Sequence, residues 1–540
     1  MIRLDGVSVT YPGSDVRAIH DVDLHVAEGE LALVVGHTGV GKSTLLKVVN
    51  GLVPHFTGGR LDGRVLVAGR DTRTNPPREL VDVVGVVQQN PLHGFVTDTV
   101  EDELAYGMES LGLPADTMRR RVEETLDLLG LADVRDRALR TLSAGQQQRV
   151  AIGSVLTTHP RVLVPDEPTS ALDPGAAEDV LATLQRLVHD LGLTVLLAEH
   201  RLERVVQFAD RLVVVGADGA VTTGPTQQML IDAPVAPPVV ELGRRLGWRP
   251  LPVTVREARR AAAPLRERLH STPTPAVTDD AAAATTSSAV VSVSDLTVRH
   301  GSLVALAGID LSVSGGEVVA VMGRNGAGKT TLMRCLVGLS VPAAGRARIV
   351  GTDPARLSGR ERVRAVGLVP SDPADLLWAE TVAQECREAD ADAGAAQGTC
   401  RQLFGELAGD VDSDTHPRDL SEGQRLALAL AVVLAADPQV LLLDEPTRGL
   451  DYAAKARLVR LLQARAAAGR TVVLATHDVE LVADVATRVV VVADGEVVAD
   501  GPTRAVVTGS PQFAPQVSKV MAPLDLLTVP EVEAQLAAVS

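Results

Sequence analysis

Two glycine-rich segments of the chain combine the residue types that can hold the phosphates of a nucleotide. They read GHTGVGKST at 36–44 and GRNGAGKTT at 323–331. Glycines let the backbone curl so that successive N–H groups point inward, the lysine supplies a positive charge, and the next hydroxyl can bind Mg²⁺. The predicted phosphate ligands are Gly36, His37, Thr38, Gly39, Val40, Gly41, Lys42, Ser43 and Thr44, and Gly323, Arg324, Asn325, Gly326, Ala327, Gly328, Lys329, Thr330 and Thr331.

Each glycine-rich segment has an acidic pair further along the chain, where an apolar run ends in Asp-Glu. The aspartate of each pair is expected to hold Mg²⁺ directly or through water, together with the hydroxyl of the glycine-rich segment. The predicted metal ligands are therefore Ser43, Asp166, Thr330 and Asp444.

The glutamate of each acidic pair stands one residue further on, where it can polarise an attacking water. We expect Glu167 and Glu445 to act in this way. His200 and His477 each follow another apolar run. A lone histidine is usually structural, but the recurrence at matching places favours a contact with the γ-phosphate and a catalytic role.

The order of these motifs repeats along the chain. LSAGQ at 142–146 returns as LSEGQ at 420–424, in each case between the glycine-rich segment and the acidic pair. The same motifs in the same order, at nearly constant spacing, indicate two copies of one domain.

Each copy alternates short apolar runs with helix-like stretches. Runs that are continuously apolar and separated by helices predict a parallel sheet covered on both faces. The runs lie at 31–35, 161–164, 194–198 and 211–215, and at 317–322, 440–443, 471–475 and 488–492. The sequence therefore predicts an α/β fold made of tandem duplicated phosphate-loop domains, each with a parallel-sheet core.

The chain's 540 residues exceed what one hydrophobic core usually holds. The arginine-rich region 235–270 allows a basic surface for nucleic acid or lipid, but its interspersed glutamates favour a solvated helical extension. The region around 280 lacks large apolar side chains, which is typical of a flexible tether. The expected parts are a first domain at 1–232, a helical extension at 233–270, a flexible linker at 271–289, a second domain at 290–508 and a C-terminal extension at 509–540.

Composition argues against several other classes of protein. The 52 Lys+Arg and 68 Asp+Glu give a net charge of −16, which disfavours nucleic-acid binding or direct contact with anionic lipid. Cys335, Cys386 and Cys400 have no CxxC spacing, so we expect no zinc or iron–sulfur site and no disulfide framework. The longest apolar run, 426–436, is shorter than the ~20 residues of a membrane span, and the N-terminus lacks a signal-peptide pattern.

The motifs in their order resemble those of an ATP-binding cassette (ABC) ATPase, once in each copy. The elements are GHTGVGKST, Gln89, LSAGQ, VPDEP, SALD and His200, then GRNGAGKTT, LSEGQ, LLLDEP, RGLD and His477. The resemblance implies ATP and Mg²⁺ as cofactors, ATP hydrolysis, and a helical subdomain beside each sheet core. It adds the ATP-binding residues Tyr11, Gln89, Ser143, Gly145, Gln146, His300, Ser421, Gly423 and Gln424, with Gln89 also a metal ligand.

The same resemblance implies that two cassettes close head to tail around two ATPs, either within one chain or between two chains. Each ATP is then held by one copy's glycine-rich loop and the other copy's LSxGQ. One site would combine Lys42, Asp166, Glu167 and His200 with Ser421 and Gly423. The other would combine Lys329, Asp444, Glu445 and His477 with Ser143 and Gly145. Closure then converts binding energy into domain motion, which hydrolysis reverses.

The second copy departs from the family pattern at two places. Ser371 stands where Gln89 stands in the first copy, and a shorter side chain cannot reach Mg²⁺ in the same way, so slower hydrolysis is expected there. His300 takes the place of Tyr11, the aromatic that the family stacks on adenine. In the first copy, Pro165 removes an N–H donor from a predicted central strand, and nothing in the sequence accounts for it.

Four stretches resemble the ATPases of energy-coupling factor importers, which take up vitamins and metal ions. They lie at 88–113, 196–205, 238–260 and 513–532. The resemblance implies two partners, an integral-membrane scaffold subunit and a membrane substrate-binding subunit. It also implies a peripheral location on the cytoplasmic face of the cell membrane. A vitamin, a vitamin precursor and a metal ion all stay open as cargo.

Two other classes with paired cassettes stay open as alternatives. One is a soluble two-cassette ATPase that acts on ribosomes or DNA. Its ribosomal members have a charged helical linker and its DNA-repair members have zinc modules, neither of which this sequence predicts. The other is a sugar-importer ATPase, against which EHRLE at 199–203 and TVEDELAYG at 99–107 argue.

Overall fold

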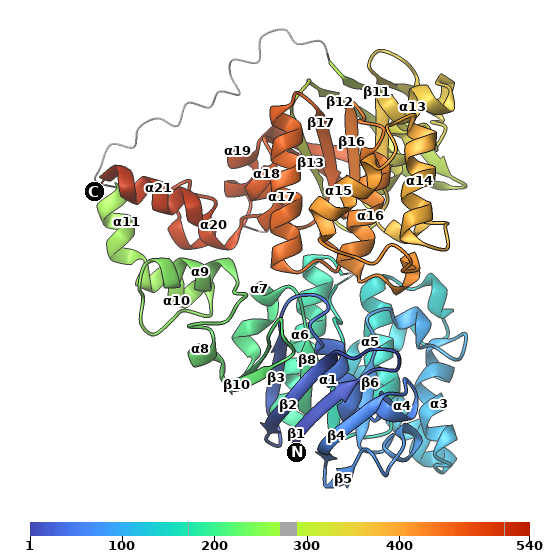
Figure 1. Cartoon of the computed structure of the whole chain (residues 1–540), viewed down its shortest axis with the longest axis vertical. Helices are drawn as coiled ribbons and strands as arrows, with labels where there is room; N and C mark the ends of the chain where they lie inside the picture. The colour runs from blue at the N-terminus through green and yellow to red at the C-terminus, as the bar shows by residue number, and fades with distance from the viewer. Residues whose placement is uncertain (171, 271–288, 512, 540) are drawn as a thin grey trace. The chain divides into compact units, whose positions relative to one another are not determined.

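The computed structural model (Figure 1) describes residues 1–170, 172–270, 289–511 and 513–539. The chain divides into two compact units, Met1–Thr254 and Val255–Ser540. The division falls inside the segment 233–270, so its first part belongs to the first unit and the rest to the second. The linker predicted at 271–289 lies outside the described residues except for Ala289.

The central sheet of the first unit has the strand order β10-β9-β3-β8-β7-β6. Its strands are β3 (Leu31–Val35), β6 (Val84–Val87), β7 (Val162–Pro165), β8 (Thr194–Ala198), β9 (Arg211–Val215) and β10 (Val221–Pro225). All neighbours pair in parallel except β10, which runs antiparallel to β9. β3, β7 and β8 are buried along their whole length, as expected for strands covered on both faces. The predicted parallel-sheet core is confirmed.

A second, antiparallel sheet of the first unit has the order β2-β1-β4-β5. Its strands are β1 (Ile2–Thr10), β2 (Arg17–Val26), β4 (Arg60–Val67) and β5 (Arg70–Asp71). One hydrophobic cluster joins Ile2 and Leu24 of this sheet to Leu45 and to Val34 and Leu196 of the central sheet. The packing of both sheets on one core fixes the helix that carries Leu45.

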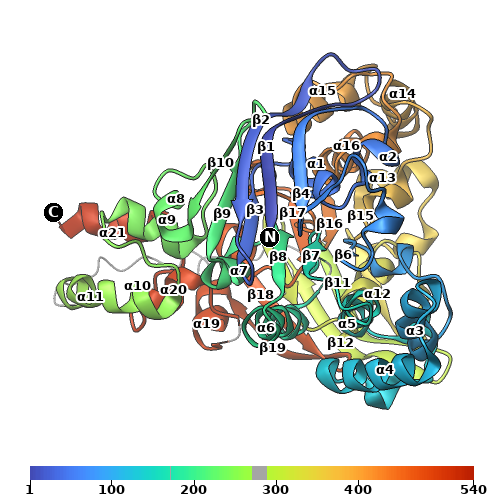
Figure 2. The ribbon, with the colours of Figure 1, turned by 90° about the horizontal axis from the view of Figure 1, so that it is seen from below.

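Of the helices of the first unit, α1 (Lys42–Val49) and α2 (Leu52–His55) contribute residues to this core. The others are α3 (Val100–Ser110), α4 (Ala115–Leu129), α5 (Ala144–Leu156), α6 (Pro174–Leu191), α7 (Leu202–Val205), α8 (Thr226–Met229) and α9 (Pro238–Arg245). Helices α3, α4 and α5 pack against one another (Figure 2) and form a helical subdomain. Helix α5 begins at a capping box, in which Ser143 and Gln146 satisfy each other's backbone N–H groups.

The second unit repeats this architecture. Its central sheet has the order β15-β16-β17-β13-β18-β19, and its antiparallel sheet has the order β12-β11-β14. The strands are β11 (Val291–His300), β12 (Leu303–Val313), β13 (Val318–Met322), β14 (Ala344–Ile349), β15 (Val366–Val369), β16 (Val440–Asp444), β17 (Thr471–Ala475), β18 (Arg488–Ala493) and β19 (Glu496–Pro502).

The helices of the second unit include a helical subdomain beside β16 and β17 (Figure 1). They are α10 (Val255–Ala261), α11 (Ala263–His270), α12 (Lys329–Leu336), α13 (Gly359–Ala365), α14 (Val382–Ala393), α15 (Thr399–Ala408), α16 (Glu422–Leu434), α17 (Tyr452–Ala467), α18 (Val479–Val485), α19 (Thr503–Thr508), α20 (Gln516–Met521) and α21 (Val529–Val539). Helices α14, α15 and α16 form the subdomain around buried Phe404 and Leu428. In the described part of the chain, no helix is both long and apolar enough to span a bilayer.

Arginines of the region 235–270 bind backbone carbonyls. Helices α10 and α11 pack against α20 and α21, and Arg259 and Arg266 donate to the carbonyls of Lys519 and Val520, at 2.7 and 2.8 Å. These carbonyls lie in the last turn of α20, where helical partners are missing. Arg244 likewise donates to the carbonyl of Leu230. These three arginines therefore tie the region to backbone of its own unit, and the predicted helical extension stays a prediction.

Candidate nucleotide-hydrolysing sites

The glycine-rich loop of each unit lies between a buried strand and the helix that it opens, β3 and α1 in the first and β13 and α12 in the second. Gly41 and Gly328, the last loop residues, have φ of 110° and 106°. A Cβ at Gly41 would lie 2.5 Å from the carbonyl oxygen of Ala18, and one at Gly328 would lie 2.6 Å from that of Ala305. Only glycine fits both the left-handed backbone and the close approach.

The lysine of each loop turns back into the loop. Lys42 Nζ donates to the carbonyls of Gly36 and His37, both at 3.0 Å, and Lys329 Nζ donates to that of Gly323 at 2.8 Å. Both lysines are buried. The positive charge therefore lies at the centre of the loop, where it can bind the β- and γ-phosphates of a nucleotide.

The predicted metal ligands meet beside each loop. Thr330 Oγ1 donates to Asp444 Oδ2 at 2.7 Å, and Ser43 likewise hydrogen-bonds to Asp166. Asp444 Oδ1 is buried and makes no hydrogen bond within the described part of the chain. A hydroxyl and a free carboxylate oxygen are hard ligands of the kind Mg²⁺ takes, in addition to phosphate and water. These residues fit an Mg²⁺ ion held together with a nucleotide.

Burial affects the protonation of both aspartates. Burial and the negative charge of Glu167 raise the pKa of Asp166, and burial raises the pKa of Asp444. A divalent cation at either carboxylate would favour the charged form and so oppose the effect of burial on the pKa.

A histidine contacts the glutamate of each acidic pair. His200 Nε2 lies 2.7 Å from Glu167 Oε1, and His477 Nδ1 lies 2.8 Å from Glu445 Oε2. The backbone of both glutamates has φ of 50°, a left-handed conformation that residues other than glycine rarely adopt. Such strain persists only where the surroundings hold it, and it is common at catalytic positions. Both predicted pairs of catalytic residues are thus brought together.

The two sites differ at the position of Gln89. Its Nε2 donates to Glu167 Oε2 at 3.0 Å, so this glutamate has both an amide and an imidazole partner. In the second unit, Ser371 lines the same cavity as Thr330 and Asp444, and Lys329 Nζ lies 3.6 Å from Glu445. Gln89 is therefore a partner of the predicted catalytic glutamate in the first unit, at the place where the second unit has a serine.

The LSxGQ motifs form the first turns of α5 and α16. Ser421 and Gln424 form the same capping box as their counterparts in the first unit. At Gly145, an added Cβ would lie 2.9 Å from the Cβ of Ala176 on α6, so close helix packing requires glycine. The expected closure of each motif over the other copy's ATP stays a prediction.

The residues expected beside adenine differ in their surroundings. The hydroxyl of Tyr11 lies 3.1 Å from Thr44 Oγ1, which places its side chain beside the first glycine-rich loop. His300 is exposed at the end of β11. The predicted adenine contacts of both residues stay predictions.

Glu199 is a buried residue beside the first site to which the sequence analysis, although it used the stretch EHRLE at 199–203, gave no role in that site. It follows β8 directly and accepts hydrogen bonds from Thr169, which lies in the loop after Glu167. A comparison of the two copies could have drawn attention to Glu199, because Thr476 takes its place before the histidine of the second copy.

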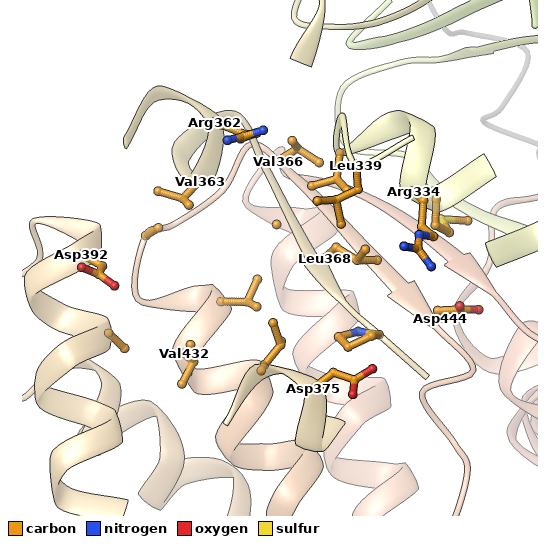
Figure 3. A pocket seen from close by; sticks show the side chains of 18 of the residues that line it. Arg334, Leu339, Arg362, Val363, Val366, Leu368, Asp375, Asp392, Val432 and Asp444 are labelled. Carbon is orange, nitrogen blue, oxygen red and sulfur yellow. The ribbon is translucent and has the colours of Figure 1, made fainter. Parts of the chain in front are cut away.

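A cavity of about 640 Å³ opens beside the second site. Figure 3 shows Arg334 and Asp444 on one side of it and Asp392 and Val432 on the other. Its lining is mostly apolar, with contributions from α12, α13, β15 and the ends of α14 and α16. The cavity thus connects the metal ligands with the helical subdomain.

Comparisons with known proteins agree with this geometry. The family described as ABC transporter matches residues 19–170 and 306–448. A Streptomyces avermitilis protein that carries the name of an ABC transporter ATP-binding protein is 63% identical, over 99% of this chain and 100% of its own length. A Methanosarcina mazei protein of the same name is 34% identical, over 91% of this chain and 87% of its own.

Solved structures share the fold at lower sequence identity. The structure of ribosome-bound archaeal Pelota and ABCE1 matches with a TM-score of 0.63 and 21% identity, over 94% of this chain and 82% of that one. At this identity the likeness concerns the fold alone.

Proposed function

The chain belongs to the ABC transporter family of ATP-binding proteins, and we propose that it is the ATPase subunit of an importer for a small solute. Family membership and two sets of nucleotide-binding residues identify the chain as an ATPase. The proposed partners are an integral-membrane scaffold and a membrane substrate-binding subunit. They would hold the ATPase peripherally on the cytoplasmic face of the membrane, and the cargo would be a vitamin, a vitamin precursor or a metal ion.

The chemistry of the proposed cycle follows from the catalytic residues. Glu167 and Glu445 orient the attacking water and accept its proton, while His200 and His477 hold the two carboxylates in place. A bound Mg²⁺ would neutralise charge on the phosphates. Phosphate release removes the negative charge that the lysine and the loop N–H groups bind, and this favours reopening.

The observation that carries the transport proposal is the cavity beside the second site. It extends from the predicted metal ligands Thr330 and Asp444 to Val432 on α16. A helix bound there would therefore lie close to both the metal site and the helical subdomain. Leu339 on its rim is 63% exposed and Val363 is 39% exposed, which leaves apolar surface for a partner to cover. The proposed occupant is an amphipathic cytoplasmic helix of the scaffold subunit, whose apolar face would cover this surface.

The direct test is purification of the tagged chain from membranes in mild detergent, followed by mass spectrometry. The proposal predicts recovery of a multi-span scaffold and a second small membrane protein. Recovery of ribosomal or other soluble partners alone would support the alternative of a soluble two-cassette ATPase. Recovery of the membrane subunits of a sugar importer would support the sugar-importer alternative.

Variants of the cavity rim make this test specific. Leu339→Asp and Val363→Asp place a charge on the proposed contact surface, and both should reduce recovery of the scaffold while ATP hydrolysis by the isolated chain is kept. Val498→Asp is a matched control, because Val498 is 60% exposed on β19 and does not line the cavity. Undiminished scaffold recovery with both rim variants would exclude this surface as the docking site.

A further inference from the structure

The ladder between β7 and β8 of the first unit is interrupted next to the catalytic residues. β7 pairs with β8 only at Val162 and Leu163, and the pairing returns as a single bridge between Asp166 and Ala198. In the second unit, β16 pairs with β17 without a break from Val440 to Asp444.

Pro165 explains the interruption. The N–H of Asp166 points away from β8 and donates to the carbonyl of Val87 on β6, at 2.9 Å. Since neighbouring residues of a strand direct their N–H groups to opposite sides, a donor at position 165 would face β8, and proline has none. The corresponding residue of the second unit is Leu443, which pairs with Leu474.

Side-chain hydrogen bonds of Glu199, which follows β8, connect it to the loop that follows β7. Oε1 accepts from Thr169 N at 2.9 Å and from Thr169 Oγ1 at 2.5 Å, and Oε2 accepts from His200 N at 3.1 Å. Glu199 and Thr169 are only 3% and 1% exposed. Three donors offset part of the cost of burying this carboxyl group, and burial still raises the pKa of Glu199.

The second unit has no glutamate at this place. Thr476 stands at the place of Glu199, and its hydroxyl accepts from the N–H of Asp478, two residues along the same loop. There the continuous β16–β17 ladder joins the strand that ends in Asp444 to the strand that precedes His477.

We propose that Glu199 is a positioning residue of the first ATPase site, which aligns His200 with Glu167 where Pro165 interrupts the strand ladder. Thr169 lies two residues after Glu167, and Glu199 immediately precedes His200. Their hydrogen bonds therefore join the loop that carries the strained glutamate to the strand end that carries its histidine partner. The proposal rests on the ATPase activity and is independent of the transported solute.

The first variant to test is Glu199→Thr, which introduces the residue of the second unit. We expect kcat for ATP hydrolysis to fall by about tenfold or more, with KM for ATP changed by less than about twofold, because alignment is lost while the glycine-rich loop is intact. Thr476→Val in the second unit is the matched control and should keep kcat within about twofold of wild type.

Rescue separates positioning from general destabilisation. Pro165→Leu supplies the missing N–H, and in the Glu199→Thr background it should restore at least half of the lost kcat, while Pro165→Leu alone should stay near wild type. Unchanged kcat in Glu199→Thr, or a loss that Pro165→Leu does not restore, would overturn the proposal. A parallel rise in KM would do the same.

Folding is followed by thermal unfolding and by binding of a fluorescent ATP analogue. If Glu199→Thr does not fold, Thr169→Val replaces it, because this variant keeps the carboxylate and removes one donor to it. It should show the same loss of kcat without a change in KM, and wild-type kcat in a folded Thr169→Val protein would contradict the proposal.

Discussion

His200 Nε2 and Glu167 Oε1 lie 2.7 Å apart in the first ATPase site. The imidazole and the carboxylate come from the ends of neighbouring strands, so their contact depends on the register of β7 and β8. Gln89 holds the other oxygen of the same carboxylate, at 3.0 Å. The glutamate is thus restrained on both sides before a water reaches it, which suits a general base.

Replacing Glu167 with glutamine should trap ATP and abolish most turnover. The amide keeps the shape of the side chain but cannot accept the proton of water, and a lost general base costs about 100-fold or more at its site. The measurement is steady-state phosphate release together with ATP retained after rapid desalting. Glu178→Gln on the exposed side of α6 is the control. Turnover above half of wild type would show that the first site is not dominant.

Lysine removal should affect the two sites unequally. Lys42→Ala is expected to reduce transport more than Lys329→Ala, because the first site has Gln89 on its catalytic glutamate and the second has Ser371 at that place. Solute uptake into cells or vesicles carrying each variant measures the difference. Equal losses would remove the argument for asymmetry.

Ser371→Gln should speed the second site. The longer side chain can reach Glu445 from the cavity that Ser371 lines, as Gln89 reaches Glu167 in the first unit. In a Glu167→Gln background, we expect phosphate release to rise by about two- to fivefold. Ser371→Asn serves as the comparison, because the asparagine side chain is one methylene shorter than that of glutamine. If glutamine has no effect, the missing amide does not limit this site.

Removal of Mg²⁺ by chelation should stop hydrolysis, and Asp444→Asn should raise the Mg²⁺ concentration needed for activity at the second site. Burial raises the pKa of Asp444, and its protonated form cannot bind the cation, so the Mg²⁺ requirement should increase as the pH falls toward that pKa. Hydrolysis is measured against free Mg²⁺ at several pH values. Asp392→Asn, at the far side of the same cavity, should behave like wild type.

The recurrence of motifs indicated which residues to expect at each candidate site, and the structure places the predicted glutamate and histidine of each unit in contact. Continuous Val and Leu runs at 194–198 and 471–475 became buried parallel strands, because apolar residues on both faces can be buried only between layers of helices. The glycine-rich loops follow β3 and β13, the strands that pair with these two runs. Buried strands and glycine-rich loops are each formed by residues that are close in sequence, so both can be recognised from the sequence.

Pro165 shows the limit of that reasoning. Its effect depends on which neighbour its nitrogen faces, and that is decided by the pairing of β7 between β6 and β8. The same holds for Glu199, whose partner Thr169 is distant along the chain but adjacent across two strand ends.

The sequence by itself determined that the chain has two nucleotide-binding copies, which residues of each copy carry the charge and the hydroxyl, and where the copies differ. Tertiary structure alone decided which groups contact each predicted catalytic glutamate and how the second site opens into an apolar cavity. The physical reason is that hydrogen-bond geometry and cavities arise from the packing of segments far apart in the chain. Residue spacing records a local motif, whereas strand register and packing set the distances between motifs.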